Sequence, residues 1–310
     1  MKKKISILLC IVLTFLCGCS ASGKNIRFGA ADIGGMYYSF ASTFSELAAK
    51  QNENYKFEVK TTAGSAANLR LLGDNYIELC IVQADLVDDA IADYDNIRAI
   101  AALYTEACQI VVRADSGINS LSDLQGKTIS IGASESGTEL NAKEILKFSG
   151  LTDELVTTKN LDYTDAAKEL TDGNIDVMFC TAGIKTTVID EISRDCDIRL
   201  ISIDDACMNK LLGNSSYYEK YTIPANTYSG QETPVNTIGV KSILLASSSL
   251  SDSTVKDITR TLFMDAKELQ YSSSLNLELT EDNATRNIHI PFHKGAADYY
   301  SSKGITVKTD

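Results

Sequence analysis

The chain has 310 residues, of which 41 are acidic and 29 are basic, so its formal net charge is −12. Nucleic acids and anionic membrane surfaces are bound through basic patches, and this charge balance argues against both as partners. The length suits two domains of ordinary size.

The first residues have the layout of an export signal. Three lysines at positions 2–4 precede an apolar run over residues 5–16, which is too short to span a membrane. The Leu-Cys-Gly-Cys sequence that ends at Cys19 resembles a bacterial lipobox, in which this cysteine is acylated and becomes the mature N-terminus. An ordinary signal peptide, cut a few residues later, is the alternative. We predict a signal peptide over 1–18, a tether over 19–25 and an extracytoplasmic protein that is lipid-anchored to the cell membrane, with a net charge of −15 once the three lysines are removed.

Short apolar runs then alternate with segments of helical periodicity. In the first such segment, Phe40, Phe44 and Leu47 fall on one helix face, and near the C-terminus Ser251 is a plausible helix N-cap. This alternation predicts parallel βα units in an open twisted sheet. The strands are expected near residues 26–28, 57–59, 79–82 and 97–103 in a first series, and near 128–131, 156–161, 175–179 and 198–203 in a second.

Two longer β-type runs, 107–113 and 235–245, are expected to carry the chain from one series to the other and back. This layout predicts an α/β fold of two lobes, with a ligand cleft between them and a hinge of two crossover strands. The first lobe is discontinuous, over residues 26–108 and 236–310, and the second covers 109–235. The C-terminal helices close the first lobe.

Two stretches of the chain, 26–47 and 128–146, make the same shape from different residues. Each is a β-type run that ends at a Gly-Ala pair, passes through a small polar turn and opens an amphipathic helix. A helix N-terminus of this kind binds anions, because its first N–H groups are unpaired and its dipole favours negative charge. The pattern therefore predicts a small acid held from two sides. The alternative is that the glycines only supply turns and the hydroxyls only cap helices. The candidate residues are Gly35, Ser136, Gly137 and Thr138.

Polar residues also follow the expected strands at their carboxyl ends, where open α/β sheets bind ligands. Gln83 and Asp85 follow one strand, Thr181 lies at the end of another, and Glu106 lies at the crossing point. If the ligand is an amino acid, Asp85 and Glu106 are the nearest acceptors for its ammonium group. A helix cap for Asp85 and a salt bridge for Glu106 are the alternatives.

Tyr37 and Tyr38 are neighbours at the start of the first helix and must point to different faces of it. One is expected to pack in the core and the other to line the cleft. The sequence leaves open which of the two does so.

The remaining reactive residues do not form a catalytic or metal-binding pattern. Cys80, Cys108 and Cys180 lie in apolar strand-like runs and are expected to be core residues, whereas pairing between Cys196 and Cys207 stays open. The two histidines, at positions 289 and 293, have no zinc spacing and are expected on the surface. We predict no metal, no cofactor and no catalytic residue.

Six motifs in order carry a resemblance to a known family: GGMYYSFASTFSELA, TTAGSAANLRLL, CIVQADLVDDAI, LYTEACQIVVRADSGINSLSDLQGKTISIGASESGT, YTIPANTY with VNTIGV, and IPFHKGAADYY. Together they resemble the TAXI branch of TRAP-transporter solute-binding proteins. The resemblance implies a two-lobed, type II periplasmic-binding-protein-like fold. It also implies a monomeric receptor that passes glutamate, glutamine or a related organic acid to a sodium-coupled TRAP-type membrane carrier. From these motifs, the residues added to the candidate binding site are Thr62, Ser65, Asn68 and Tyr228.

The chain departs from the family pattern at two places. Ser39 stands where the family usually has proline, and Ala66-Ala67 replace a usual Val-Glu pair near the cleft mouth. The second change bears on ligand identity more than on fold. Two other functions fit the same scaffold: a sensory or docking lipoprotein, and an enzyme that would need an acid or base in the cleft.

Overall fold

The computed structural model describes residues 24–273 and 279–310. The predicted signal peptide and the lipidation site at Cys19 lie outside the described residues. Within them, no helix is both long enough and apolar enough to cross a membrane.

The first lobe begins with two βα units that the hydrophobic pattern predicts. Strand β1 pairs in parallel with both β2 and β3, and all five residues of β3 are buried. Phe40 and Phe44 of the first helix are fully buried against this sheet and stack on each other. These elements are β1 (Lys24–Gly29), α2 (Met36–Gln51), β2 (Tyr55–Lys60), α3 (Ser65–Gly73), β3 (Leu79–Gln83), η1 (Ala84–Leu86) and α4 (Val87–Asp93).

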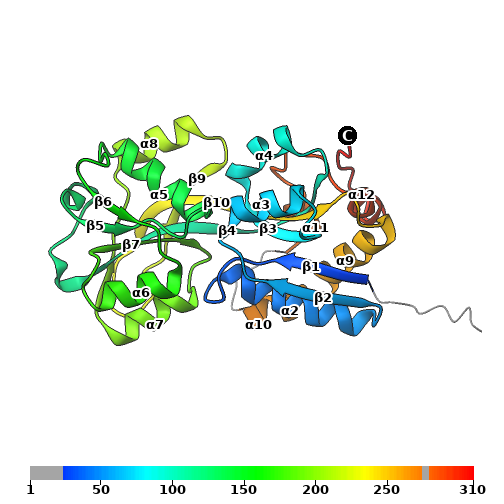
Figure 1. The fold of residues 1–310 in the computed structure, drawn as a ribbon, viewed down its shortest axis with the longest axis horizontal. Coiled ribbons are helices and arrows are strands. Elements are labelled where there is room, and N and C mark those ends of the chain that lie inside the picture. The colour runs from blue at the N-terminus through cyan, green and yellow to red at the C-terminus, as the bar shows by residue number, and fades with distance from the viewer. Residues whose placement is uncertain (1–23, 274–278) are drawn as a thin grey trace, which may run out of the picture.

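The second lobe repeats the arrangement, with β5 parallel to both β6 and β7. Its helices cover both faces of its part of the sheet (Figure 1). The elements are η2 (Ala114–Ser116), η3 (Leu121–Leu124), β5 (Thr128–Ser130), α5 (Gly137–Phe148), β6 (Thr157–Lys159), α6 (Tyr163–Thr171), β7 (Val177–Ala182), α7 (Thr187–Asp195), β8 (Ile198–Leu200), α8 (Asp205–Asn214) and β9 (Tyr218–Ile223).

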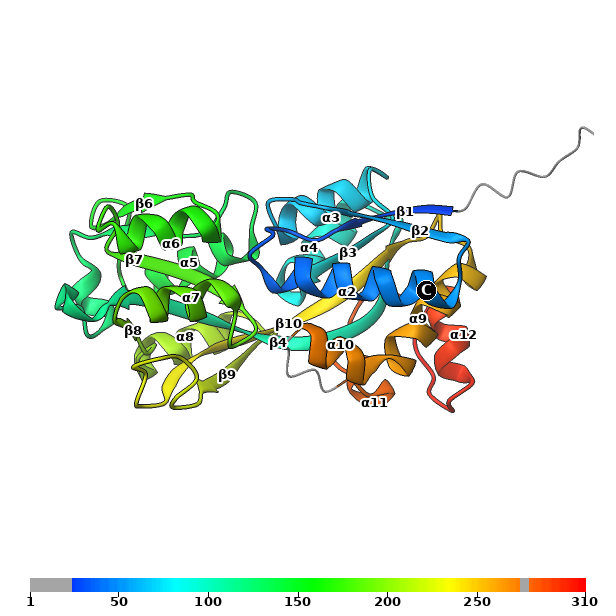
Figure 2. The same ribbon diagram turned by 90° about the horizontal axis from the view of Figure 1, so that it is seen from below.

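Two long strands, β4 (Ile97–Arg113) and β10 (Val235–Ser247), run through both lobes and join them, as Figures 1 and 2 show. They pair with each other, and their register shifts between Lys241 and Ile243 and again at Leu244. The strands of the described residues belong to one ten-stranded sheet, whose main order is β2-β1-β3-β10-β4-β7-β5-β6. The crossover prediction is confirmed. The residue bounds of the lobes stay a prediction, because both strands run through both lobes.

The expectation of a parallel sheet is wrong at the centre of the molecule. Strand β10 is antiparallel to β3, β4 and β9, and β4 is antiparallel to β7 and β8. The reason is that each crossover strand runs out of one lobe and into the other. Each is therefore antiparallel to neighbouring strands that lie within a single lobe. The hairpin of β9 with β10 was also not predicted, because only the two end residues of β9 are buried and the strand lacks an apolar run.

The C-terminal helices pack on the first lobe (Figure 2). Ser251 caps α9 as predicted, accepting a hydrogen bond from the Thr254 N–H at 3.3 Å. The surface position expected for His293 is wrong: only 3% of it is exposed, and its Nδ1 accepts from the Gly295 N–H at the start of α12. The helix must lie close here, since a Cβ on Gly295 would lie 2.2 Å from the Asp252 carbonyl oxygen. The elements are α9 (Asp252–Met264), α10 (Ala266–Ser273), α11 (Glu281–Ala284) and α12 (Lys294–Ser301).

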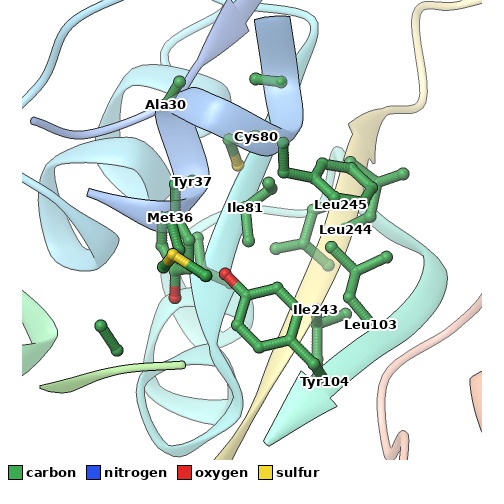
Figure 3. Close-up of a cluster of buried hydrophobic side chains, with 14 of the residues drawn as sticks. Ala30, Met36, Tyr37, Cys80, Ile81, Leu103, Tyr104, Ile243, Leu244 and Leu245 are labelled. Carbon is green, nitrogen blue, oxygen red and sulfur yellow. The ribbon is translucent and has the colours of Figure 1, made fainter. Parts of the chain in front are cut away.

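The core of the first lobe lies between α2 and the central strands. Figure 3 shows Met36 and Tyr37 of α2 facing Ile81, Tyr104 and Ile243 of β3, β4 and β10.

The five cysteines of the described chain are all free. Cys80, Cys108 and Cys180 are buried strand residues, as predicted. The Cys196–Cys207 pair does not form.

Candidate functional site

A cavity of about 360 Å³ lies between the two lobes. Its wall is formed on one side by the loop after β1, the starts of α2 and α3, and the polar residues of β3 and β4. On the other side it is formed by the starts of α5 and α6 and the end of β7. The carboxyl ends of β1, β3, β5 and β7 thus lie around one space, as expected for open α/β sheets.

Tyr37 reaches this cavity and Tyr38 does not. The Tyr37 hydroxyl donates to Glu106 Oε2 at 2.9 Å, and both residues line the wall. Tyr38 is half-buried and packs against the hydrophobic core. Gly35, at the N-cap of α2, also lines the wall.

Glu106 is the most deeply placed carboxyl group in the wall, with 2% of the residue exposed. Burial raises its pKa to about 8, against the lowering effect of hydrogen bonds from Tyr37 and Gln83. The salt-bridge alternative does not hold, because within the described residues Glu106 makes no ion pair. Lys, Arg and His are absent from the described cavity wall, which instead contains the three acids Asp32, Glu106 and Asp162.

The start of α5 is held by hydrogen bonds inside the protein. Ser136 Oγ accepts from the Glu139 N–H at 3.0 Å, so Ser136 is the N-cap. Thr138 Oγ1 accepts from the Thr181 N–H at 3.2 Å and lies 2.7 Å from the Tyr163 hydroxyl. Tyr163 in turn donates to the Thr181 carbonyl at 2.9 Å. Tyr163 has one proton to donate, so the Thr138 hydroxyl must donate to it, and a closed ring of three hydrogen bonds joins α5, α6 and β7.

Gly137 brings the two lobes into contact at the cavity. A Cβ on Gly137 would lie 2.3 Å from Gln83 Oε1, so the Gln83 amide packs directly on the backbone of α5. Gln83 comes from β3 of the first lobe and is 2% exposed. Its Oε1 is buried without a hydrogen-bond partner.

The N-terminus of α3 is occupied by the opposite lobe. The Ala66 and Ala67 N–H groups donate to the Glu135 carbonyl at 3.1 and 3.2 Å. Arg70 pairs with the Glu135 carboxylate, with Nη2 2.9 Å from Oε2 and Nε 3.2 Å from Oε1. Glu135 takes the left-handed conformation, with φ of +64°, to reach this position. The start of α6 also lines the cavity, but its N-cap is the carboxylate of Asp162, so the N-termini of α2 and α5 are the ones that face the cavity without an acidic cap.

Four residues of the predicted site lie behind the wall rather than in it. Besides Tyr38, these are Asn68, Asp85 and Tyr228. Asn68 and Tyr228 form hydrogen bonds with other buried polar groups of the protein. Asn68 donates to the Ile81 carbonyl at 2.9 Å, and the Tyr228 hydroxyl donates to Gln109 at 2.6 Å. The predicted residues that do line the cavity are Gly35, Tyr37, Thr62, Ser65, Gln83, Glu106, Ser136, Gly137, Thr138 and Thr181.

Asp85 links the lobes behind the cavity. Its Oδ2 accepts from Asn141 Nδ2 at 2.9 Å and from the Tyr218 hydroxyl at 3.1 Å, both in the second lobe. Burial raises the pKa of Asp85 to about 7. The alternative of a helix cap does not hold either, because its described partners are side chains of the other lobe.

The sequence interpretation missed Asp32, Asp162 and Tyr163, which line the cavity from both lobes. Burial, and then the charge of Asp162, raises the pKa of Asp32. Asp162 is the N-cap of α6 and accepts from the Asp165 N–H at 2.8 Å. The cap pattern before the helix was the one available signal, whereas the loop residue Asp32 lies in no periodic element.

Comparisons with known proteins identify the family of the chain and its fold. The family model of the NMT1-like family matches residues 28–304. The chain belongs to the NMT1-like family.

Among solved structures, this family member is similar to a putative L-cystine ABC transporter from Listeria monocytogenes, at 15% identity and a TM-score of 0.54, over 81% of this chain and 94% of that one. It is also similar to the alkanesulfonate-binding protein SsuA from Xanthomonas axonopodis pv. citri bound to MOPS, at 15% identity and a TM-score of 0.51, over 90% of each chain. At these identities the likeness is one of fold. The fold is the mixed α/β, type II periplasmic-binding-protein fold.

Proposed function

We propose that this protein is an extracytoplasmic solute-binding receptor, which captures a small carboxylate and delivers it to a TRAP-type membrane carrier. The observation that carries the proposal is the cavity of about 360 Å³ between two lobes joined by two strands, with two helix N-termini facing it. Small-molecule sites are concave and have about this size. The type II fold and the family resemblance support the same function.

The solute carboxylate is bound by backbone N–H groups at the starts of α2 and α5. The Thr138 hydroxyl already donates within the second lobe, so the N–H groups rather than this side chain are the donors. Polar side chains fix the orientation of the rest of the solute. The proposed contacts are Gly35, Tyr37, Thr62, Ser65, Gln83, Glu106, Ser136, Gly137, Thr138 and Thr181.

Thermal-shift measurement of the purified chain from residue 20 onward, against amino acids and organic acids, tests this proposal. A ligand at a hundred times its dissociation constant adds about 2.7 kcal/mol of stability if it binds only the folded state. A rise in melting temperature with stoichiometric binding and no product is the expected result. A panel in which no carboxylate raises the melting temperature contradicts the proposal.

The carrier class needs a separate experiment, because one similar structure is described as an ABC transporter protein. Uptake of a bound, radiolabelled solute is measured in membrane vesicles of the cells that make this protein, with the protein added. A sodium gradient is expected to drive uptake. Uptake that needs ATP and not sodium would assign the receptor to an ABC-type importer instead.

A further inference from the structure

We infer that the solute carries a positively charged nitrogen and no net negative charge, so that neutral amino acids are bound and glutamate and dicarboxylates are rejected. This inference rests on the proposed function and narrows its solute class. Two observations support it: the charges of the side chains in the cavity wall, and the polar atoms of the wall that lack hydrogen-bond partners.

The wall has carboxyl groups and lacks cationic side chains among the residues described. Asp32 lies on the first lobe and Asp162 on the second, and the charge of Asp162 raises the pKa of Asp32, so the two act on each other across the space between the lobes. Glu106 lies deeper, next to Tyr37. A second negative charge on the solute would therefore meet the carboxyl groups of Asp32 and Asp162. A cationic nitrogen would be stabilised by them, and it would also favour the ionised form of Glu106, which is protonated below a pKa of about 8 in the free protein.

The unpartnered atoms of the wall point to the same chemistry. Gln83 is 2% exposed, and its Oε1 is a buried acceptor without a partner. Its amide donates toward Glu106, so Oε1 lies on the other side, against Gly137 of α5. Asp32 Oδ2 is likewise buried and unpartnered. Gln83 Oε1 can only accept, and Asp32 Oδ2 can only accept when Asp32 is ionised, so a group that satisfies both atoms must donate.

The anion-binding capacity of the cavity is limited. A helix N-terminus carries roughly half a positive charge, and the α3 N-terminus is already occupied by the Glu135 carbonyl. The termini of α2 and α5 together suffice for about one carboxylate. A zwitterion with one carboxylate and one ammonium matches both parts of the wall, and a dicarboxylate does not.

Calorimetric titration at pH 7 with glutamine, glutamate and glutarate tests the inference, because the three have the same carbon chain and differ in charge. The remaining standard amino acids and putrescine complete the panel. We expect glutamine or another neutral amino acid to bind at least about tenfold more tightly than glutamate, and glutarate not to bind. Binding of glutamate or glutarate as tight as that of any neutral amino acid overturns the inference and leaves the proposed carboxylate receptor intact.

Two further outcomes separate the inference from the proposed function. If putrescine binds and no acid does, the cationic requirement holds and the carboxylate proposal fails. If no compound of the panel binds, both fail.

Single-residue variants of the wall acids then test whether these side chains cause the selectivity. Asp32→Asn and Glu106→Gln are each expected to weaken amino-acid binding at least about tenfold and to reduce the discrimination against glutamate. The matched control is Glu219→Gln, which removes an exposed acid that bonds to Thr105 beside Glu106. If Glu106→Gln does not fold, Asp32→Asn alone tests whether the wall acids cause the selectivity, because Asp32 is only half-buried. Unchanged selectivity in the variants that fold overturns the assignment.

Discussion

A buried carboxyl group at a cavity wall has consequences for stability before any ligand binds. Glu106 faces Tyr37 of α2 and Gln83 of β3, and Tyr104, Asp85, Tyr163 and Cys180 are the other titratable groups that act with it. Ionised Glu106 is poorly solvated there, so the folded protein keeps its proton up to a pKa of about 8.

The sign of the pH effect follows from this raised pKa. The unfolded chain loses the Glu106 proton near pH 4.5, whereas the folded protein holds it, so the contribution to stability is complete below pH 4.5 and is lost as the pH rises through about 8. Differential scanning calorimetry at pH 5, 6.5 and 8 should show a melting temperature that falls more steeply for the wild type than for Glu106→Gln. Parallel curves for the two proteins would show that Glu106 does not hold its proton.

Thr138 illustrates a residue whose role differs from the one that its motif suggests. Its hydroxyl accepts from the Thr181 N–H and donates to Tyr163, so its proton is not available to a ligand. Thr138→Val leaves the buried Thr181 N–H without an acceptor, which should cost about 1–3 kcal/mol in the free energy of unfolding of the ligand-free protein. Denaturant titration measures this cost, and Thr138→Ser, which keeps the hydroxyl, is the control. A destabilisation of equal size in both variants would contradict the role of the hydroxyl ring.

At the scale of elements, the hydrophobic pattern predicted most strands because buried strands are apolar runs. Strand β4 was predicted as two runs, 97–103 and 107–113, because Tyr104, Thr105 and Glu106 interrupt its apolar sequence. The backbone nevertheless continues through them, and Glu106 faces the cavity. A polar interruption of a buried strand was therefore the strongest local signal of the site.

The sequence does not distinguish the polar residues that lie behind the cavity wall from those that line the cavity. Asn68 belongs to the same motif as Thr62, which lines the wall. At Asn68 and Tyr228 the polar character that suggested ligand binding serves internal hydrogen bonds instead. Asp32 was missed for the opposite reason, because a loop residue has no periodicity. Which side of a wall a polar group faces depends on the packing of distant elements.

Gly137 at the start of α5 tests whether the contact between the lobes matters for binding. The Cβ of Gly137→Ala would overlap the Gln83 amide, and φ is not in the left-handed region, so α5 itself can accept alanine. We expect ligand affinity to fall at least about tenfold while the melting temperature of the free protein stays within a few degrees of the wild type.

The matched control is Gly213→Ala in α8, where an added Cβ meets no atom within 4 Å. It should leave affinity unchanged and stabilise the helix by about 0.5–1 kcal/mol. Wild-type affinity in Gly137→Ala would mean that Gln83 moves aside freely and that this contact does not limit binding.

At the scale of the whole molecule, attachment to the membrane is predicted to depend on one residue outside the described structure. No helix in residues 24–273 and 279–310 is apolar and long enough to cross a membrane. Because the lipobox predicts a lipid anchor on Cys19, Cys19→Ser should move the protein from the membrane fraction to the soluble extracytoplasmic fraction. Immunoblotting of the two fractions after a high-salt wash measures this. A variant that stays with the membrane would contradict the lipid anchor.

The two strands shared by both lobes also bear on how the protein unfolds and how it can be rearranged. Neither lobe has a complete sheet without β4 and β10, because β3 pairs with β10 and β7 pairs with β4. The lobes should therefore melt in a single cooperative transition, and an isolated lobe should not be a stable fragment. Circular permutants with new termini inside either strand should fail to fold, whereas termini in the exposed turn at Gly230, between β9 and β10, should be tolerated.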